Sequence, residues 1–268
     1  MLHTVSRGSF ALSALAICIS TTVGTTTANA AQNAAPKEET LVVTANRAQS
    51  SLWESPATIQ VIDQQTLKNA TSTSIADDLQ DIPGVEVTDN SLAGRKQIRI
   101  RGEASSRVLI LIDGQEVTYQ RAGDNYGVGL LIDESALERI EVVKGPYSVL
   151  YGSQAIGGVV NFITRKGGDK PIAGTVKAVY NSSTAGWEES AAAWGSIGQF
   201  DYRINGSYSD QGDRKTPDGR LPDTHNRNNS QAIWLGYNLD NQHFGLSLDR
   251  YRLSTQTYFE DTEGAYDA

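Results

Sequence analysis

The sequence contains few or none of several residue types and patterns. Each absence excludes a class of protein or makes it improbable. Cys18 is the only cysteine in 268 residues, so no disulfide can form within the chain. No long apolar run follows the N-terminal segment, which excludes a helical membrane protein. The net charge of −8 argues against a general nucleic-acid binder. No acid–base pair, nucleophile or metal-ligand cluster stands out, so we predict no catalytic residue and no metal site.

Residues 1–30 have the pattern of a secretory signal peptide. His3 and Arg7 give the positively charged start, residues 10–19 the apolar core, and residues 28–30 the small-residue cleavage site. The apolar core is too short to span a bilayer. The mature chain is therefore expected to contain no cysteine, since Cys18 would be removed with the signal.

The most ordered pattern in the chain lies between Glu138 and Arg165. Two β-prone runs, residues 140–144 and 159–165, flank a segment rich in glycine and proline. This layout predicts a strand, a tight connection with a helical turn at residues 147–150, and a second strand. Glycines before the second run would allow a close approach of the backbone.

This stretch, ERIEVVKGP…YGSQAIGGVVNFIT, resembles the end of the plug domain of TonB-dependent outer-membrane receptors. The upstream segments DIPGV, IRIRG and LILIDG are also typical of that domain, so the resemblance covers about residues 39–165. It implies an α+β plug domain, a small mixed sheet with short helices, over residues 56–168. It also implies a place in the cell outer membrane of a Gram-negative bacterium, with the plug inside an antiparallel β-barrel of about twenty-two strands.

Residues 39–45 form a short β-prone segment within residues 31–55, a predicted mobile N-terminus. An ordinary edge strand is one interpretation. The resemblance implies instead a TonB box, which the periplasmic protein TonB captures by pairing with it as an added strand. The residues of this box are Glu39, Thr40, Leu41, Val42, Val43, Thr44 and Ala45.

The plug region has a recognisable succession of short elements. A helix capped by Thr73 or Ser74 is expected to end near Leu79, and an earlier helical turn covers residues 64–69. Strands are predicted at residues 58–62, 85–88, 97–101 and 108–112.

Arg99 and Arg101 lie two positions apart in one of these strands, so they are expected to face the same side. A solvated ion-pair face is one interpretation. The resemblance implies instead that these charges pair with carboxylates of the barrel and hold the plug in place, an arrangement that is costly to break singly.

Two polar loops, residues 89–96 and 119–127, are candidates for ligand contact. The resemblance implies that such plug loops lie at the extracellular apex. Their tyrosine, arginine and asparagine side chains suit an anionic, planar ligand, although a polar loop without a role in binding is equally compatible. The candidate ligand-binding residues are Arg95, Lys96, Tyr119, Arg121, Asn125 and Tyr126.

Residues 169–268 show the long apolar–polar alternation of transmembrane β-strands, and short connections alternate with long ones. A soluble β-sandwich would not need that asymmetry. About five strands are expected, at residues 173–180, 189–196, 200–208, 231–239 and 242–251. Five strands cannot close a barrel in lipid, because the open edges would leave backbone groups unpaired. We therefore expect this sequence to be an N-terminal piece of a longer receptor.

These patterns and the resemblance predict a receptor for active uptake of a small metal chelate, with a ferric siderophore as the transported ligand and no covalently bound cofactor. The predicted partners are TonB with its inner-membrane energising complex and outer-membrane lipid, not nucleic acid. Haem is an alternative ligand, although residues 31–224 contain no histidine to ligate its iron. Cobalamin is another. A soluble periplasmic binding module is the alternative of a different class, and the alternation beyond Ala173 argues against it.

Overall fold

The computed structural model describes residues 41–42, 50–51, 58–70, 74–89, 96–117, 132–217 and 219–255. All of them belong to the unit Glu39–Ala268. In this part of the chain no helix has the length and apolarity needed to cross a membrane.

A five-stranded mixed sheet forms the plug. The strands Val108–Ile112 and Gly158–Thr164 run parallel, and the other neighbouring strands run antiparallel. Apolar side chains form two buried clusters, one with Ile140, Val142 and Phe162 and the other with Leu109 and Val143. The predicted small mixed sheet is therefore confirmed. Its strands, in order across the sheet, are β3 (Thr58–Ile62), β8 (Leu137–Lys144), β9 (Gly158–Thr164), β6 (Val108–Ile112) and β7 (Gln115–Glu116).

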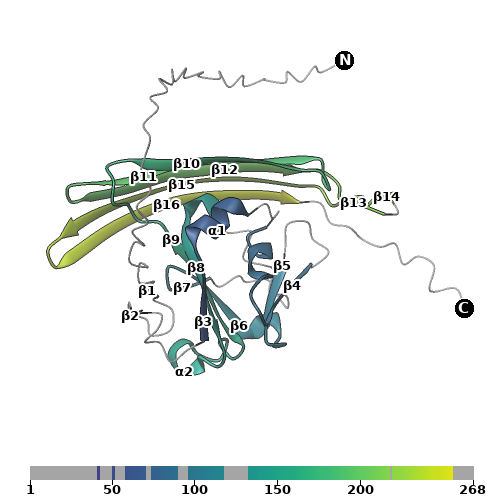
Figure 1. The fold of residues 1–268 in the computed structure, drawn as a ribbon, viewed down its shortest axis with the longest axis horizontal. Helices are drawn as coiled ribbons and strands as arrows, with labels where there is room; N and C mark the ends of the chain where they lie inside the picture. Colours follow the sequence, from purple (N-terminus) through teal and green to yellow (C-terminus); the bar gives the residue numbers. More distant parts are fainter. Residues whose placement is uncertain are drawn as a thin grey trace, which may run out of the picture. The chain divides into compact units, whose positions relative to one another are not determined.

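Short elements accompany this sheet, and Figure 1 shows the two helices and the longer of the two-stranded sheets beside it. Leu67 of one helix and Leu79 of a 3-10 turn are buried in the core. These elements are α1 (Gln64–Asn69), η1 (Asp77–Leu79), η2 (Ser105–Arg107), η4 (Glu134–Ala136), α2 (Ser148–Tyr151) and two two-stranded sheets, β1–β2 (Leu41–Val42 with Ser50–Ser51) and β4–β5 (Val85–Asp89 with Lys96–Ile100).

Glycine at position 158 is required by a close backbone approach. A Cβ there would lie 2.4 Å from the carbonyl oxygen of Val143 on the neighbouring strand, and the glycine has a φ of +155°. Lys144 and Gly158 are register partners between β8 and β9. The glycines predicted to allow close approach therefore do so at the start of β9.

Two predictions within the plug need correction. The helix expected to end near Leu79 is only the three-residue 3-10 turn η1, and Thr73 lies outside the described residues. Arg101 is not part of a strand, because β5 ends at Ile100 and Arg101 has a φ of 54°. Arg101 and Gly102, whose φ is 78°, form a turn closed by the amide of Glu103 donating to the carbonyl of Ile100 (3.0 Å). The two arginines therefore do not share a strand face.

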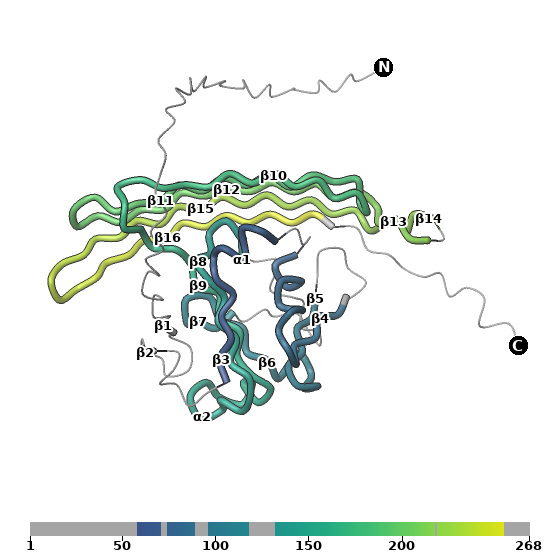
Figure 2. Tube along the Cα trace, in the orientation of Figure 1, coloured from purple at the N-terminus to yellow at the C-terminus, as the bar shows by residue number. Residues whose placement is uncertain are grey.

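The second part of the chain is an antiparallel sheet of five long strands, here called the wall. The strands follow one another in chain order and lie side by side in Figures 1 and 2. A two-residue turn, Gly198–Gln199, separates two of them, and the connection of residues 212–225 contains the short pair β13–β14 (Lys215–Thr216 with Gly219–Arg220). The five predicted strands are confirmed, and most extend further toward the longer connections. They are β10 (Ala173–Asn181), β11 (Gly186–Ile197), β12 (Phe200–Gln211), β15 (Asn226–Leu239) and β16 (Gln242–Thr255).

Side chains alternate between two faces of the wall. On β12, Arg203 and Asn205 are buried against the plug, whereas Ile204 between them is 53% exposed. This outward face carries exposed apolar residues and tilted aromatic pairs at both ends, as transmembrane strands do. The apolar residues of this face are Val176, Tyr180, Trp187, Ile197, Phe200, Ile204, Tyr208, Ile233, Leu235, Leu239, Phe244, Leu246 and Leu248.

Candidate functional site

The turn η4 belongs to the plug and contacts the wall through side chains. Asp133 caps this turn, because its Oδ1 accepts from the amide of Ser135 (2.9 Å). Its other oxygen, Oδ2, accepts a hydrogen bond from Nδ2 of Asn205 on β12 (3.0 Å). Both side chains are buried, at 8% and 4% exposure. One carboxylate therefore orders the turn and anchors it to the wall.

An ion pair adds to this anchor. Nζ of Lys177 on β10 lies 2.9 Å from Oε1 of Glu134, and each side chain is 18% exposed. Burial raises the pKa of Glu134; Lys177 opposes that rise, and the negative charges of Glu188 and Asp133 add to it. The pKa rises overall, so the cost of removing the carboxylate from water outweighs the attraction of the single lysine.

Two arginines complete the contact. Nη1 of Arg203 on β12 donates to the backbone carbonyls of Arg165 (2.8 Å) and Ala136 (3.4 Å), which belong to the plug. The guanidinium of Arg165 in turn lies over the ring of Trp194 on β11, 4.3 Å from its centroid, a cation–π contact. Six residues are called the latch from here on: Asp133, Glu134, Arg165, Lys177, Arg203 and Asn205.

A cavity of about 580 Å³ adjoins the latch between plug and wall. Nε of Arg203 and Oδ1 of Asn205 are buried without a hydrogen-bond partner among the described residues. Buried polar atoms of this kind are normally satisfied by protein or ordered water, so a polar, wet cavity suits them. Its charged and polar lining includes Asp113, Glu116, Lys166, Arg203, Asn205 and Asp249.

The two arginines predicted to pair with barrel carboxylates, Arg99 and Arg101, are not part of the latch. Arg99 lies on β5, which pairs with β4 and not with the wall. Arg101 donates its backbone amide to Gly84 (2.7 Å), and its charge helps to lower the pKa of Lys144, which burial lowers first. Pairing of either arginine with barrel carboxylates stays a prediction.

One predicted ligand residue lies in the described part of the chain. Nζ of Lys96 is 3.2 Å from Oδ1 of Asp77, and the two side chains are 13% and 18% exposed. This ion pair ties β5 to η1. The other candidates lie outside the described residues: Arg95, Tyr119, Arg121, Asn125 and Tyr126.

The predicted TonB box is described only at Leu41 and Val42. These two residues form β1, with Leu41 opposite Ser51 and Val42 opposite Ser50. The backbone there is extended and pairs as a strand. The remaining box residues lie outside the described part: Glu39, Thr40, Val43, Thr44 and Ala45.

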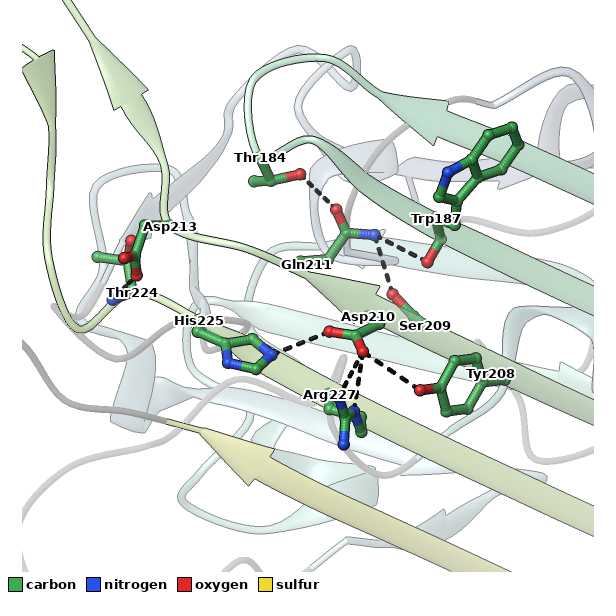
Figure 3. A network of polar contacts seen from close by, with 10 residues as sticks. All are labelled: Thr184, Trp187, Tyr208, Ser209, Asp210, Gln211, Asp213, Thr224, His225 and Arg227. Atoms are coloured by element: carbon green, nitrogen blue, oxygen red, sulfur yellow. Dashed lines mark hydrogen bonds and ion pairs between the residues drawn. The ribbon is translucent and has the colours of Figure 1, made fainter. Parts of the chain in front are cut away.

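A second polar cluster lies where the wall strands meet their longer connections (Figure 3). Oδ1 of Asp210 lies 2.9 Å from Nε2 of His225, and Oδ2 accepts from Nη2 (2.6 Å) and Nε (3.0 Å) of Arg227. The hydroxyl of Tyr208 also donates to Asp210 (3.3 Å). Asp210 is thus held by neighbouring side chains, and it stands on the outward face of β12.

Sequence reasoning did not find the latch. Its hydrogen bonds join residues far apart in the chain, such as Asn205 and Asp133, 72 positions apart, and no local pattern reports such pairs. Two signals pointed toward it: the helix-capping pattern of Asp133 and Ser135, and a large cation, Arg203, at an inward position of β12.

Comparisons with known proteins identify the family. The sequence profile of the TonB-dependent Receptor Plug Domain matches residues 51–159. The iron-regulated outer membrane virulence protein of Vibrio cholerae serotype O1 is 43% identical over 141 residues, which is 51% of this chain and 21% of that protein. The chain belongs to the TonB-dependent outer-membrane receptor family.

Two other relatives are matched over very different shares of their own length. Protein YoeA of Escherichia coli K12 is 66% identical over 102 residues, covering 38% of this chain and 78% of YoeA. The vitamin B12 transporter BtuB of Vibrio vulnificus is 39% identical over 127 residues, covering 47% of this chain and 20% of BtuB. The receptor chain thus spans about a fifth of the two Vibrio relatives.

Solved structures show the same architecture. The ferric enterobactin receptor PfeA matches with a TM-score of 0.58 and 25% identity, over 73% of this chain and 33% of PfeA. FpvA of Pseudomonas aeruginosa, bound to a ferric pyoverdine, matches with a TM-score of 0.66 and 21% identity, over 78% of this chain and 27% of FpvA. The fold class, a plug followed by strands of a β-barrel, is therefore confirmed.

Proposed function

We propose that this chain supplies the plug and the first wall strands of a receptor that actively imports an iron chelate, with a ferric siderophore as the transported ligand. The observation that carries the proposal is the 43% identity to an iron-regulated outer membrane virulence protein over 141 residues. The likeness to a ferric enterobactin receptor supports the same ligand class.

The coupling step in this proposal begins at the TonB box. Leu41 and Val42 already have the extended, strand-paired backbone that strand addition to TonB requires. TonB, energised from the inner membrane, would pull on residues 39–45 and draw the plug away from the wall. The chain's own residues supply no energy for this step. In this proposal the chain acts as a transport receptor and not as an enzyme.

A pull on the plug must break the contacts of the latch. Glu134–Lys177, Asp133–Asn205 and the Arg203 bonds all cross from plug to wall. They are polar, and their groups can exchange protein partners for water once the cavity beside them opens. We infer that this cavity is where a path for the chelate widens when the plug moves.

Cobalamin is the second candidate ligand, since a vitamin B12 transporter is 39% identical over 127 residues. Haem was the other alternative from the sequence. In the described part of the chain both histidines contact other side chains, His225 with Asp210 and His243 with Asn238.

Equilibrium binding of the purified receptor to ferric catecholate and hydroxamate siderophores, haem and cobalamin tests the ligand class. We expect saturable binding of a ferric siderophore and none of the metal-free siderophore. Saturable binding of cobalamin or haem alone would overturn the proposed substrate and leave the family assignment in place.

A further inference from the structure

A small cavity lies beside the latch, between the plug and the wall. Its volume is about 50 Å³, enough for only a few water molecules. Among the described residues, three carboxylates line it, those of Asp133, Glu134 and Glu188, together with serine hydroxyls and the phenol of Tyr251. Carboxylates that share a confined space repel one another when all are ionised. The protons that these groups hold therefore affect the contact between plug and wall.

Glu188 brings a negative charge from the wall into this contact. It lies on β11, where its inward position alternates with exposed neighbours such as Glu189. Across the β10–β11 pair, Lys177 is opposite Ser190, two positions from Glu188. Residues placed diagonally in this way are about 7–8 Å apart. Lys177 therefore attracts Glu188 while its Nζ is bonded to Glu134.

In the part of the chain that the structure describes, the negative charges of this cluster outnumber the positive charges that face it. Asp78 of η1 adds a fourth carboxylate, whose charge acts on Glu188. Arg203 is a second cation beside Lys177, and it interacts with Asp133. Lys68 of α1 lines the neighbouring cavity, but its side chain is exposed and its charge is screened by water.

A proton relieves this imbalance. A carboxyl that binds one loses its negative charge and gains an O–H donor, so it can donate a hydrogen bond to a neighbouring carboxylate. Burial raises the pKa of Glu134, and the charges of Glu188 and Asp133 add to the rise, so the proton is retained above the ordinary range of a glutamate. When the proton leaves at higher pH, two glutamates compete for Lys177 and the contact weakens.

We propose that Glu188, by competing with Glu134 for Lys177, makes the latch sensitive to acidity. In acid the cluster holds a proton, and the plug is bound more tightly to the wall. At higher pH the contact loosens, and a weaker pull suffices to move the plug. The consequence for uptake rests on the proposed function, whereas the proton-dependent contact is a property of the folded receptor alone.

The experiment is amide hydrogen exchange on the full-length receptor, purified in detergent, from about pH 5 to about pH 8, with neither chelate nor TonB present. The amide of Ala136 donates to the carbonyl of Asp133 (3.0 Å), and the amide of Arg165 donates to the carbonyl of Ala136 (2.9 Å). Arg203 of the wall bonds the carbonyls of Ala136 and Arg165, so these two amides report where plug and wall separate. After correction for the intrinsic exchange rate, their protection in the wild type should fall by about three- to tenfold as the pH rises.

Three variants locate the effect. Glu188→Gln removes the competing charge and keeps the size of the side chain, so protection of the two amides should rise by about three- to tenfold at the high pH and become nearly independent of pH. Glu189→Gln is the matched control, because it makes the same change at the next residue, which is exposed on the outward face; it should keep the wild-type pH dependence. Glu134→Gln, a second change within the cluster, should also reduce that dependence.

Three outcomes would overturn the proposal. The first is protection in the wild type that does not fall as the pH rises, and the second is a fall of the same size in Glu188→Gln. The third is loss of the pH dependence in Glu189→Gln, because any charge on this strand would then act equally. Failure of the receptor to bind a ferric siderophore would overturn the proposed function, but it would leave this result unchanged, since no ligand is present in the exchange experiment.

Discussion

Glu134 and Lys177 form an ion pair 2.9 Å long between the turn η4 of the plug and the first strand of the wall. Lys177 is the cation paired with Glu134, while Asp133 and Glu188 add negative charge nearby. The turn and the wall strand therefore share a half-buried charge cluster in which negative charges outnumber the single lysine. Such a contact stabilises the packing of the plug against the wall. Water can solvate its polar groups once they separate.

Removing the lysine should weaken the contact. Lys177→Met leaves the carboxylate of Glu134 without its cation, and we expect the free energy of unfolding to fall by about 1–3 kcal/mol. Urea titration of wild type and variant measures the difference. Lys170→Met, at an exposed position outside the strands, is the control and should change little; equal effects of the two substitutions would contradict a specific role for Lys177.

The raised pKa of Glu134 gives the latch a pH dependence. A carboxyl whose pKa is higher when folded contributes most stability below its unfolded value, about 4.3, and loses it as the pH rises through the folded pKa. We expect Glu134→Gln to become more stable relative to wild type as the pH is raised from about 4 through that interval. Unfolding curves at a series of pH values give the difference, and a difference independent of pH would show that Glu134 titrates normally.

Gly158 should tolerate no side chain. In Gly158→Ala the new methyl carbon would meet the carbonyl of Val143, so β8 and β9 would have to separate locally, and overpacking of this kind costs about 1–3 kcal/mol beyond the backbone strain. Gly114→Ala is the matched control, since it has a positive φ and no atom within 4 Å of the added carbon. We expect thermal unfolding to shift more for Gly158→Ala; the reverse order would contradict the packing account.

Much of the fold could be predicted because it depends on local pattern. The strand Thr58–Ile62 and the helix Gln64–Asn69 were predicted residue for residue, since alternation and the capping side chain of Asp63 are both visible in the sequence. The long wall strands followed from alternation alone.

The rest depended on turn chemistry or on contacts distant in sequence. Arg101 was assigned to a strand, but Gly102 after it favours a left-handed two-residue turn, and the chain turns there. The partners of Asn205 and Arg203 come from the plug, 38 to 72 positions away. The spacing of residues within β12 does not predict them. The latch therefore had to be read from the structure.

The central claim, that a pull on the TonB box drives uptake, is tested most directly by Val42→Pro. Proline removes a backbone donor and fixes φ, so it should prevent strand pairing with TonB. Energised uptake and surface binding of an iron-59 siderophore are measured on cells producing the full receptor, with Ala34→Pro, before the box, as the matched control. The account predicts that Val42→Pro abolishes uptake while binding is unchanged and the control transports normally. Uptake at the wild-type rate in Val42→Pro would contradict it.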